Sequence, residues 1–128
     1  MGINLPEDIS LQAFFNGKII FQSKGHWLYP LFDFEEYLKN HPVDKALLEV
    51  HDKVIGKAAA LLVLRLGIGC VYGNVMSELA DTVLCQAGIP HFYKKLIERI
   101  DCQTEELLIE INDADSAYEI LCKRANRC

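Results

Sequence analysis

The segment of residues 47–89 constrains the fold most strongly, because strand-like and helix-like runs alternate along it. Residues 46–51 form a short apolar run, and a run rich in Ala and Leu follows it and ends at Gly67, a typical helix stop. Residues 69–76 are again β-prone, Ser77 then has the form of a helix N-cap, and Gly88 closes the helix that follows. Two strands joined by one short helix lie parallel, with a right-handed crossover. The segment therefore predicts two consecutive parallel β-α units.

A hairpin and a helix are expected before this unit. Asn16-Gly17 separates two β-prone runs, residues 11–15 and 18–22, and this dipeptide is the strongest short signal for a type I′ turn. Apolar residues spaced three and four apart predict a helix that begins at Tyr29. That helix stops before Pro42, which disfavours helical backbone in the residue preceding it.

The signals after Pro90 leave alternatives open. Residues 91–93 could form a short strand, although 93–100 could also be helical, and 107–111 fit either a fifth strand or a helical turn. Residues 113–124 predict a last helix, acidic at its start and basic at its end. The whole chain is expected to be an α/β protein, a three-layer α/β/α sandwich with a mixed sheet of about five strands.

Composition narrows the class of protein. The chain has 128 residues, which suits a single domain over 1–128, and 51% of them are hydrophobic. A net charge of -5 makes a nucleic-acid partner unlikely, since nucleic-acid-binding surfaces are usually basic. The five cysteines form no Cys-x-x-Cys pair, and we see no signal peptide and no apolar run long enough to cross a membrane. We therefore expect reduced thiols, a cytoplasmic location and no membrane partner.

Two short motifs point to a known family. The order of hairpin, helix and two β-α units resembles the cytidine-deaminase-like fold. The string DKVIGKAAA at residues 52–60, together with Ser77-Glu78, resembles the signature of a small, mostly bacterial family of unknown function placed in that superfamily. The resemblance covers about residues 10–124. It implies a deaminase-like fold with a pocket beyond the carboxyl ends of the central strands.

The zinc-binding motifs of the deaminases are missing from both corners of that pocket. Active members carry His-x-Glu at the first corner and Pro-Cys-x-x-Cys at the second. Here Lys53 stands two residues after His51, and Ala80 and Val83 follow Glu78 where the two cysteines would be. We therefore expect no metal, no cofactor and no zinc-dependent deamination.

Seven residues at these corners are candidate ligand-binding residues: Asp52, Lys53, Gly56, Lys57, Ser77, Glu78 and Cys102. A helix N-terminus presents N–H groups and positive potential, and Gly56 would let a ligand approach the backbone closely. Two nearby lysines would add positive charge. Together these features suit a small phosphorylated or nucleotide-like ligand.

Each candidate also has a purely structural interpretation. Asp52 could cap the helix, the two lysines could be solvated, and Ser77 with Glu78 could simply begin the second helix. Cys102 could be a small buried hydrophobe, and Cys70 and Cys85 are expected in the core. His51 is more often structural than catalytic at such a position. Trp27, with His26 and Tyr29, could form an aromatic lid or could pack on a helix.

Three functions are consistent with these residues. The first is an inactive deaminase-like domain that binds a small phosphorylated or nucleotide-like ligand. The second is a zinc-independent enzyme that acts on such a ligand through Glu78 or Cys102. The third is an interaction protein that forms homo-oligomers through the apolar helix around residues 58–66.

Overall fold

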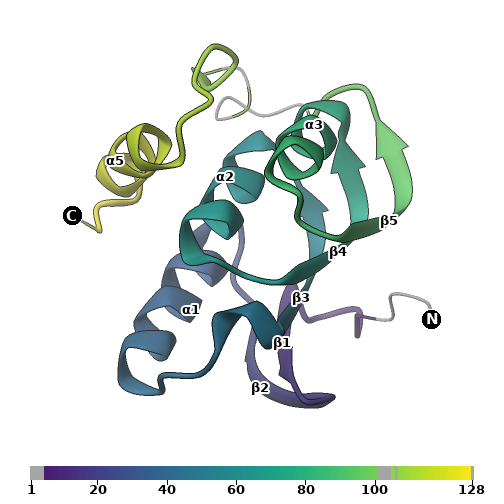
Figure 1. Cartoon of the computed structure of the whole chain (residues 1–128), viewed down its shortest axis with the longest axis vertical. Coiled ribbons are helices and arrows are strands. Elements are labelled where there is room, and N and C mark those ends of the chain that lie inside the picture. Colours follow the sequence, from purple (N-terminus) through teal and green to yellow (C-terminus); the bar gives the residue numbers. More distant parts are fainter. Residues whose placement is uncertain (1–4, 101–104, 106, 128) are drawn as a thin grey trace.

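The computed structural model describes residues 5–100, 105 and 107–127, and its centre is a five-stranded mixed sheet (Figure 1). The strand order is β2-β1-β3-β4-β5. β3, β4 and β5 are parallel, whereas β1 is antiparallel to both of its neighbours. The strand bounds are β1 Leu11–Phe15, β2 Lys18–Ser23, β3 Leu48–Ile55, β4 Cys70–Ser77 and β5 His91–Ile97.

The predicted hairpin is confirmed. Asn16 and Gly17 connect β1 to β2 with φ angles of 52° and 76°. A type I′ turn requires positive φ at both central residues, which Asn and Gly adopt most readily.

The helix limits also follow local chemistry. The described helices are α1 Tyr29–Asn40, α2 Lys57–Leu66, α3 Glu78–Ala87 and α5 Ala114–Ala125, with a 3-10 turn at Lys45–Leu47. Gly67 and Gly88 end α2 and α3 in the left-handed conformation, as predicted. The Ser77 hydroxyl accepts a hydrogen bond from the Ala80 N–H and caps α3, and Asp113 caps α5 in the same way through Ser116.

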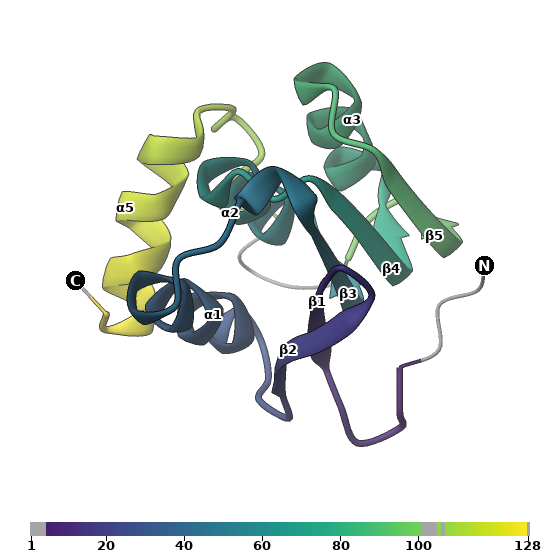
Figure 2. The same cartoon turned by 60° about the horizontal axis from the view of Figure 1, so that its bottom comes forward.

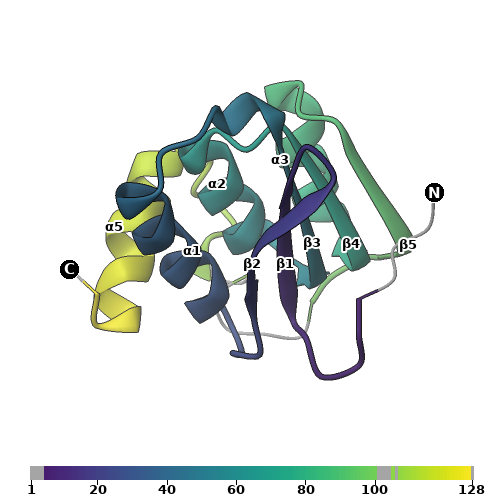
Figure 3. The same cartoon turned by 90° about the horizontal axis from the view of Figure 1, so that it is seen from below.

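The described residues do not show the expected three-layer sandwich, because their four α-helices all lie on one face of the sheet (Figures 2 and 3). The chain steps from β3 to β4 to β5 in one direction, so two right-handed crossovers place α2 and α3 on the same face. α1 and α5 then pack against α2. The guanidinium of Arg65 in α2 lies 3.4 Å from the centre of the Tyr118 ring in α5.

Two element boundaries differ from the predictions. β3 runs to Ile55 instead of ending at residue 51, because Val54 and Ile55 continue the parallel pairing with Val75 and Met76. The first corner of the site therefore lies at Gly56, and α2 begins at Lys57. β5 extends to Ile97, so the helical alternative over 93–100 is wrong.

The alternatives for residues 107–111 are also resolved. Leu107 is helical and a turn follows it, so the helical turn is confirmed and a strand is excluded. Within the described residues, no helix has the length and apolar character needed to cross a bilayer.

The other face of the sheet carries a row of rings. His51 lies between Phe14 and Tyr72, with ring centroids 4.6 Å away on each side, and Tyr72 stacks on Phe92 at 5.0 Å. Burial lowers the pKa of His51, and its Nε2 atom has no hydrogen-bond partner among the described residues. The Phe92 side of this row is open, since Phe92 is 51% exposed.

Three cysteines depart from the expectations. Cys70 is only half-buried, and Cys85 is exposed on α3 although both were expected in the core. Cys122 is disulfide-bonded, so the expectation of reduced thiols does not hold for it.

Candidate functional site

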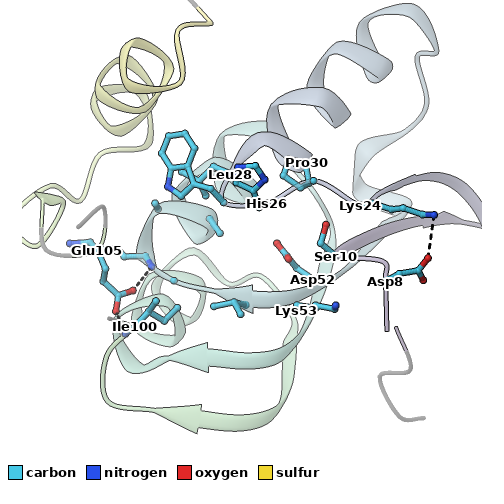
Figure 4. Close-up of a pocket in the computed structure, with 17 residues that line it drawn as sticks. Asp8, Ser10, Lys24, His26, Leu28, Pro30, Asp52, Lys53, Ile100 and Glu105 are labelled. Atoms are coloured by element: carbon cyan, nitrogen blue, oxygen red, sulfur yellow. Dashed lines mark hydrogen bonds and ion pairs between the residues drawn. The ribbon is translucent and has the colours of Figure 1, made fainter. Parts of the chain in front are cut away.

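A cavity of about 420 Å³ lies at the carboxyl end of β3, beside the N-terminus of α2 (Figure 4). Its walls come from the loop before α1 and from the strand-to-helix corner at Gly56. The residues that line it lie between 8 and 10, 24 and 30, and 52 and 59, together with Ile100 and Glu105. The carboxyl ends of parallel strands are where α/β proteins usually bind ligands, so the cavity is the candidate functional site.

Asp52 supplies a carboxyl group inside this cavity. Figure 4 shows its side chain pointing inward beside that of Ser10. Burial raises the pKa of Asp52 from 3.8 to about 7, although the N–H groups of Val54 and Lys53 partly oppose the shift. Asp52 lies within β3 and not at a helix start, so the prediction that it caps α2 is wrong.

The two lysines line the cavity but direct their amino groups apart. Nζ of Lys53 donates to the backbone carbonyl of Glu7. Lys57 is buried, and its Nζ donates to the carbonyl of Ile109 at 3.0 Å. Burial lowers the pKa of Lys57, while Glu105 acts in the opposite direction. Neither lysine is simply solvated, and they do not form the paired positive charge that the sequence suggested.

Glu105 forms the inner wall, and no motif in the sequence indicated it. Its Oε2 accepts hydrogen bonds from the Lys57 backbone N–H at 2.7 Å and from the Ser77 hydroxyl at 2.8 Å. Its Oε1 accepts one from the Ile100 N–H at 2.7 Å. This buried carboxylate therefore holds the first N–H group of α2 and the capping residue of α3 together.

Gly56 allows other atoms to approach the backbone closely, but these atoms belong to the protein's own side chains and not to a ligand. A Cβ atom at this position would lie 2.8 Å from Oε2 of Glu105 and 2.9 Å from Cδ1 of Ile100. The glycine thus makes room for Glu105 at the helix start.

Ser77 and Glu78 do not share the cavity. Ser77 is fully buried behind Glu105, where it caps α3 as its structural interpretation predicted. Glu78 is exposed in the first turn of α3 and lies outside the cavity lining. Cys102 lies outside the residues that the structure describes.

Trp27 and His26 line the opposite wall of the cavity. The Trp27 ring meets the Tyr29 ring edge-on, with centroids 5.2 Å apart, and Trp27 is 36% exposed. Its φ angle is 56°, a conformation that costs free energy for a bulky side chain. Strain of this kind is found disproportionately at functional sites.

The first turn of α2 completes the site. The N–H groups of Ala58 and Ala59 have no acceptor among the described residues, and both residues line the cavity. Unpaired N–H groups at a helix start favour a negatively charged group. The site thus combines an aromatic wall, a carboxyl group of raised pKa and a small anion-binding position.

Comparison with known proteins gives a family and a related structure. Residues 6–124 match the family described as TM1506, domain of unknown function (DUF1893). The crystal structure of a DUF1893 family protein (TM1506) from Thermotoga maritima is similar to this chain, with 26% sequence identity and a TM-score of 0.81. The match covers 92% of this chain and 82% of that one, whereas no curated protein matches.

Proposed function

We propose that this chain, which belongs to the DUF1893 family of unknown function, binds a small nucleoside- or nucleotide-type ligand in the cavity beyond β3. The observation that carries the proposal is the Asp52 carboxyl group, which points into the cavity and forms no ion pair among the described residues. A carboxyl group that is largely removed from water and has no cation beside it is costly to keep charged unless it serves a ligand.

The raised pKa of Asp52 suits a heterocyclic base. At neutral pH a carboxyl group with a pKa of about 7 is present in both its neutral and its charged form. The neutral form offers one donor and one acceptor, which match the adjacent ring nitrogen and amino group of a pyrimidine or purine. Trp27 offers a flat surface for the same ring, and such stacking is worth about 1–3 kcal/mol per base.

A phosphate group is expected to contribute less to the affinity of this site than the base. It would accept hydrogen bonds from the N–H groups of Ala58 and Ala59. The carboxylate of Glu105 already accepts a hydrogen bond from the neighbouring N–H of Lys57, and its negative charge would repel the phosphate. We therefore expect the base, more than the phosphate, to determine affinity.

The positions of the candidate catalytic side chains favour ligand binding over catalysis. Glu78 lies outside the cavity lining, so its carboxylate does not face a ligand held there. His51 lies in the ring row on the opposite face of the sheet from the helices.

A relationship to the deaminase-like fold is part of this proposal as well. It is supported by the mixed strand order β2-β1-β3-β4-β5 and by the cavity at the carboxyl end of β3.

Tryptophan fluorescence tests the proposal directly, because Trp27 is the only tryptophan in the chain. We would titrate nucleosides, their 5′-monophosphates and sugar phosphates, and record emission and melting temperature. A base-containing ligand is expected to change the emission and, at one hundred times its dissociation constant, to stabilise the fold by about 2.7 kcal/mol.

Matched variants identify the residue responsible. Asp52→Ala is expected to weaken binding at least tenfold, whereas Asp115→Asn, an exposed change in α5, leaves it intact. Binding of sugar phosphates but not of nucleosides would contradict the role of the base. A panel without any response would overturn the proposal.

A second candidate function rests on the uncovered face of the sheet. The homo-oligomer expected from α2 is not available, since α2 is buried between the sheet and α5. Phe92 is 51% exposed at the edge of the ring row, and a second copy of this chain could cover it. Sedimentation of the native chain and of Phe92→Ser tests this: a dimer that Phe92→Ser dissociates supports it, and a native monomer excludes it.

A further inference from the structure

Three side chains with metal-binding atoms converge at the far end of α3, and neither the cavity nor its proposed ligand uses them. Asp81 and Cys85 lie one turn apart on α3, and His91 begins β5. Nε2 of His91 lies 2.7 Å from Oδ1 of Asp81 and 3.7 Å from Sγ of Cys85. Sγ of Cys85 lies 3.9 Å from the same carboxylate oxygen.

Local sequence chemistry builds this cluster. Residues four apart share one face of a helix, which places Asp81 above Cys85. Gly88 ends the helix in the left-handed conformation, and the chain then turns through Pro90 into β5. The short connection brings His91 under the last turn of α3, with 11% of its side chain exposed.

Both ring nitrogens of His91 face acceptor oxygens, so a positively charged species is needed beside the ring. Its Nδ1 lies 2.7 Å from the carbonyl oxygen of Ile89, and its Nε2 lies 2.7 Å from the carboxylate of Asp81. Both neighbours are acceptors, but a neutral imidazole has only one N–H to donate. Either a proton or a metal cation therefore lies between Nε2 and the carboxylate oxygen.

The thiol of Cys85 favours the metal cation. A proton shared by His91 and Asp81 has no use for a sulfur atom beside both of them, whereas a metal ion gains a third ligand from it. The Nδ1–H to Ile89 bond is the kind of contact that orients a metal-binding histidine. Thiolate, imidazole and carboxylate together are the ligand set typical of zinc.

We propose that Asp81, Cys85 and His91 form a binding site for a divalent transition metal of the zinc class. The separations of 3.7 and 3.9 Å are close to what tetrahedral ligands need. The carboxylate must move away from Nε2, since such ligand atoms lie about 3.3 Å apart around zinc. Because Cys85 is exposed, the fourth position would be open to water. Binding would release the thiol proton of Cys85 to the solvent.

Cobalt(II) titration of the purified 128-residue chain is the first experiment, because cobalt replaces zinc and reports thiolate ligation by a near-ultraviolet charge-transfer band. We expect this band with one equivalent of cobalt, and we expect zinc to displace it. Cys85→Ser should abolish the band, and His91→Ala should weaken zinc affinity at least 100-fold. Cys70→Ser, which changes a half-buried thiol on β4, is the matched control and should keep the band.

Two results would overturn the proposal. One is the absence of a cobalt band together with His91 ring ¹⁵N shifts that do not respond to zinc, which would leave a charged His91–Asp81 pair as the explanation. The other is a band that survives Cys85→Ser, which would place the metal on other cysteines. Asp81→Asn provides an additional check that does not depend on a thiol: it should weaken zinc binding while the fold, monitored by circular dichroism, persists.

Discussion

The backbone N–H of Lys57 donates a 2.7 Å hydrogen bond to Oε2 of Glu105, a residue 48 positions later in the chain. The same oxygen accepts the hydroxyl proton of Ser77, so one buried carboxylate joins the starts of α2 and α3. A helix N-terminus stabilises a negative charge. Here the N-termini of α2 and α3 share the single negative charge of Glu105. Glu105 therefore connects the wall of the cavity to the packing of the two crossover helices.

Removing the Glu105 side chain should cost a large share of the stability. Glu105→Ala leaves the hydroxyl of Ser77 and two backbone N–H groups without their buried acceptor, so we expect a loss of about 3 kcal/mol in the free energy of unfolding. Glu105→Gln should lose less, about 1–2 kcal/mol, because one amide oxygen still accepts. Urea denaturation measures both, with the exposed change Glu119→Ala as the control. A loss below 1 kcal/mol for Glu105→Ala would contradict the arrangement.

Gly56→Ala should destabilise the chain through contact rather than through backbone strain. Its added Cβ would meet Oε2 of Glu105 at 2.8 Å, and such overpacking typically costs about 1–3 kcal/mol. Gly67→Ala is the matched control: its Cβ meets nothing within 4 Å, but its φ of +78° costs about 1 kcal/mol for alanine.

A double mutant separates these causes. In a chain that already carries Glu105→Ala, the contact with Oε2 of Glu105 is gone while that with Cδ1 of Ile100 remains, so Gly56→Ala should cost less, and the cost of Gly67→Ala should stay unchanged. Equal costs of Gly56→Ala in both backgrounds would exclude the contact with Glu105 as its source.

Local patterns predicted the parts of the fold that local physics determines. The Asn16-Gly17 turn and the ends of α2 and α3 at Gly67 and Gly88 depend on left-handed backbone that few residues adopt. The position of Glu105 depends instead on a contact 48 residues away, in a segment with weak periodicity. No spacing in the sequence indicates such a partner, so the site was predicted without its inner wall.

The directions in which the side chains of the site point could not be predicted from the sequence either. Asp52 was expected at the start of the helix, but β3 continues through the pairing of Val54 with Val75, so the helix starts only at Lys57. Asp52 therefore became a cavity residue within β3, and Lys57 turned away toward Ile109. The common face of α2 and α3, in contrast, could have been deduced, because two right-handed crossovers in one direction leave both helices on the same face. The positions of α1 and α5 depend on their packing against α2, which no local pattern indicates.

Trp27 should tolerate glycine better than alanine. Its φ of 56° penalises any residue with a Cβ atom, by about 1–2 kcal/mol. Both substitutions lose the ring contact with Tyr29, so Trp27→Gly should be about 1 kcal/mol more stable than Trp27→Ala. Paired urea unfolding curves followed by circular dichroism compare the two. If alanine is equal or better, the left-handed conformation at this position is not maintained in solution.

Asp52 should make stability fall as pH rises. Its folded pKa of about 7 lies above the ordinary value of 3.8, so between these values the folded chain binds more protons than the unfolded chain. The stability that the proton maintains is complete below pH 3.8 and is lost as pH rises to 7. A shift of this size corresponds to about 4 kcal/mol, and the partial exposure of the side chain reduces it to about 2–4 kcal/mol.

Asp52→Asn isolates this contribution, because the amide has nearly the same shape and carries no titrating proton. The variant should match the native chain at pH 4 and exceed its stability by about 2–4 kcal/mol at pH 8. Denaturant unfolding at both pH values measures the difference, in which the other titrating groups cancel. A native chain that remains as stable as Asp52→Asn at pH 8 would mean that the carboxylate is already solvated or paired. In that case Asp52 would not be a carboxyl group without a cation in the cavity, for which a ligand could compensate.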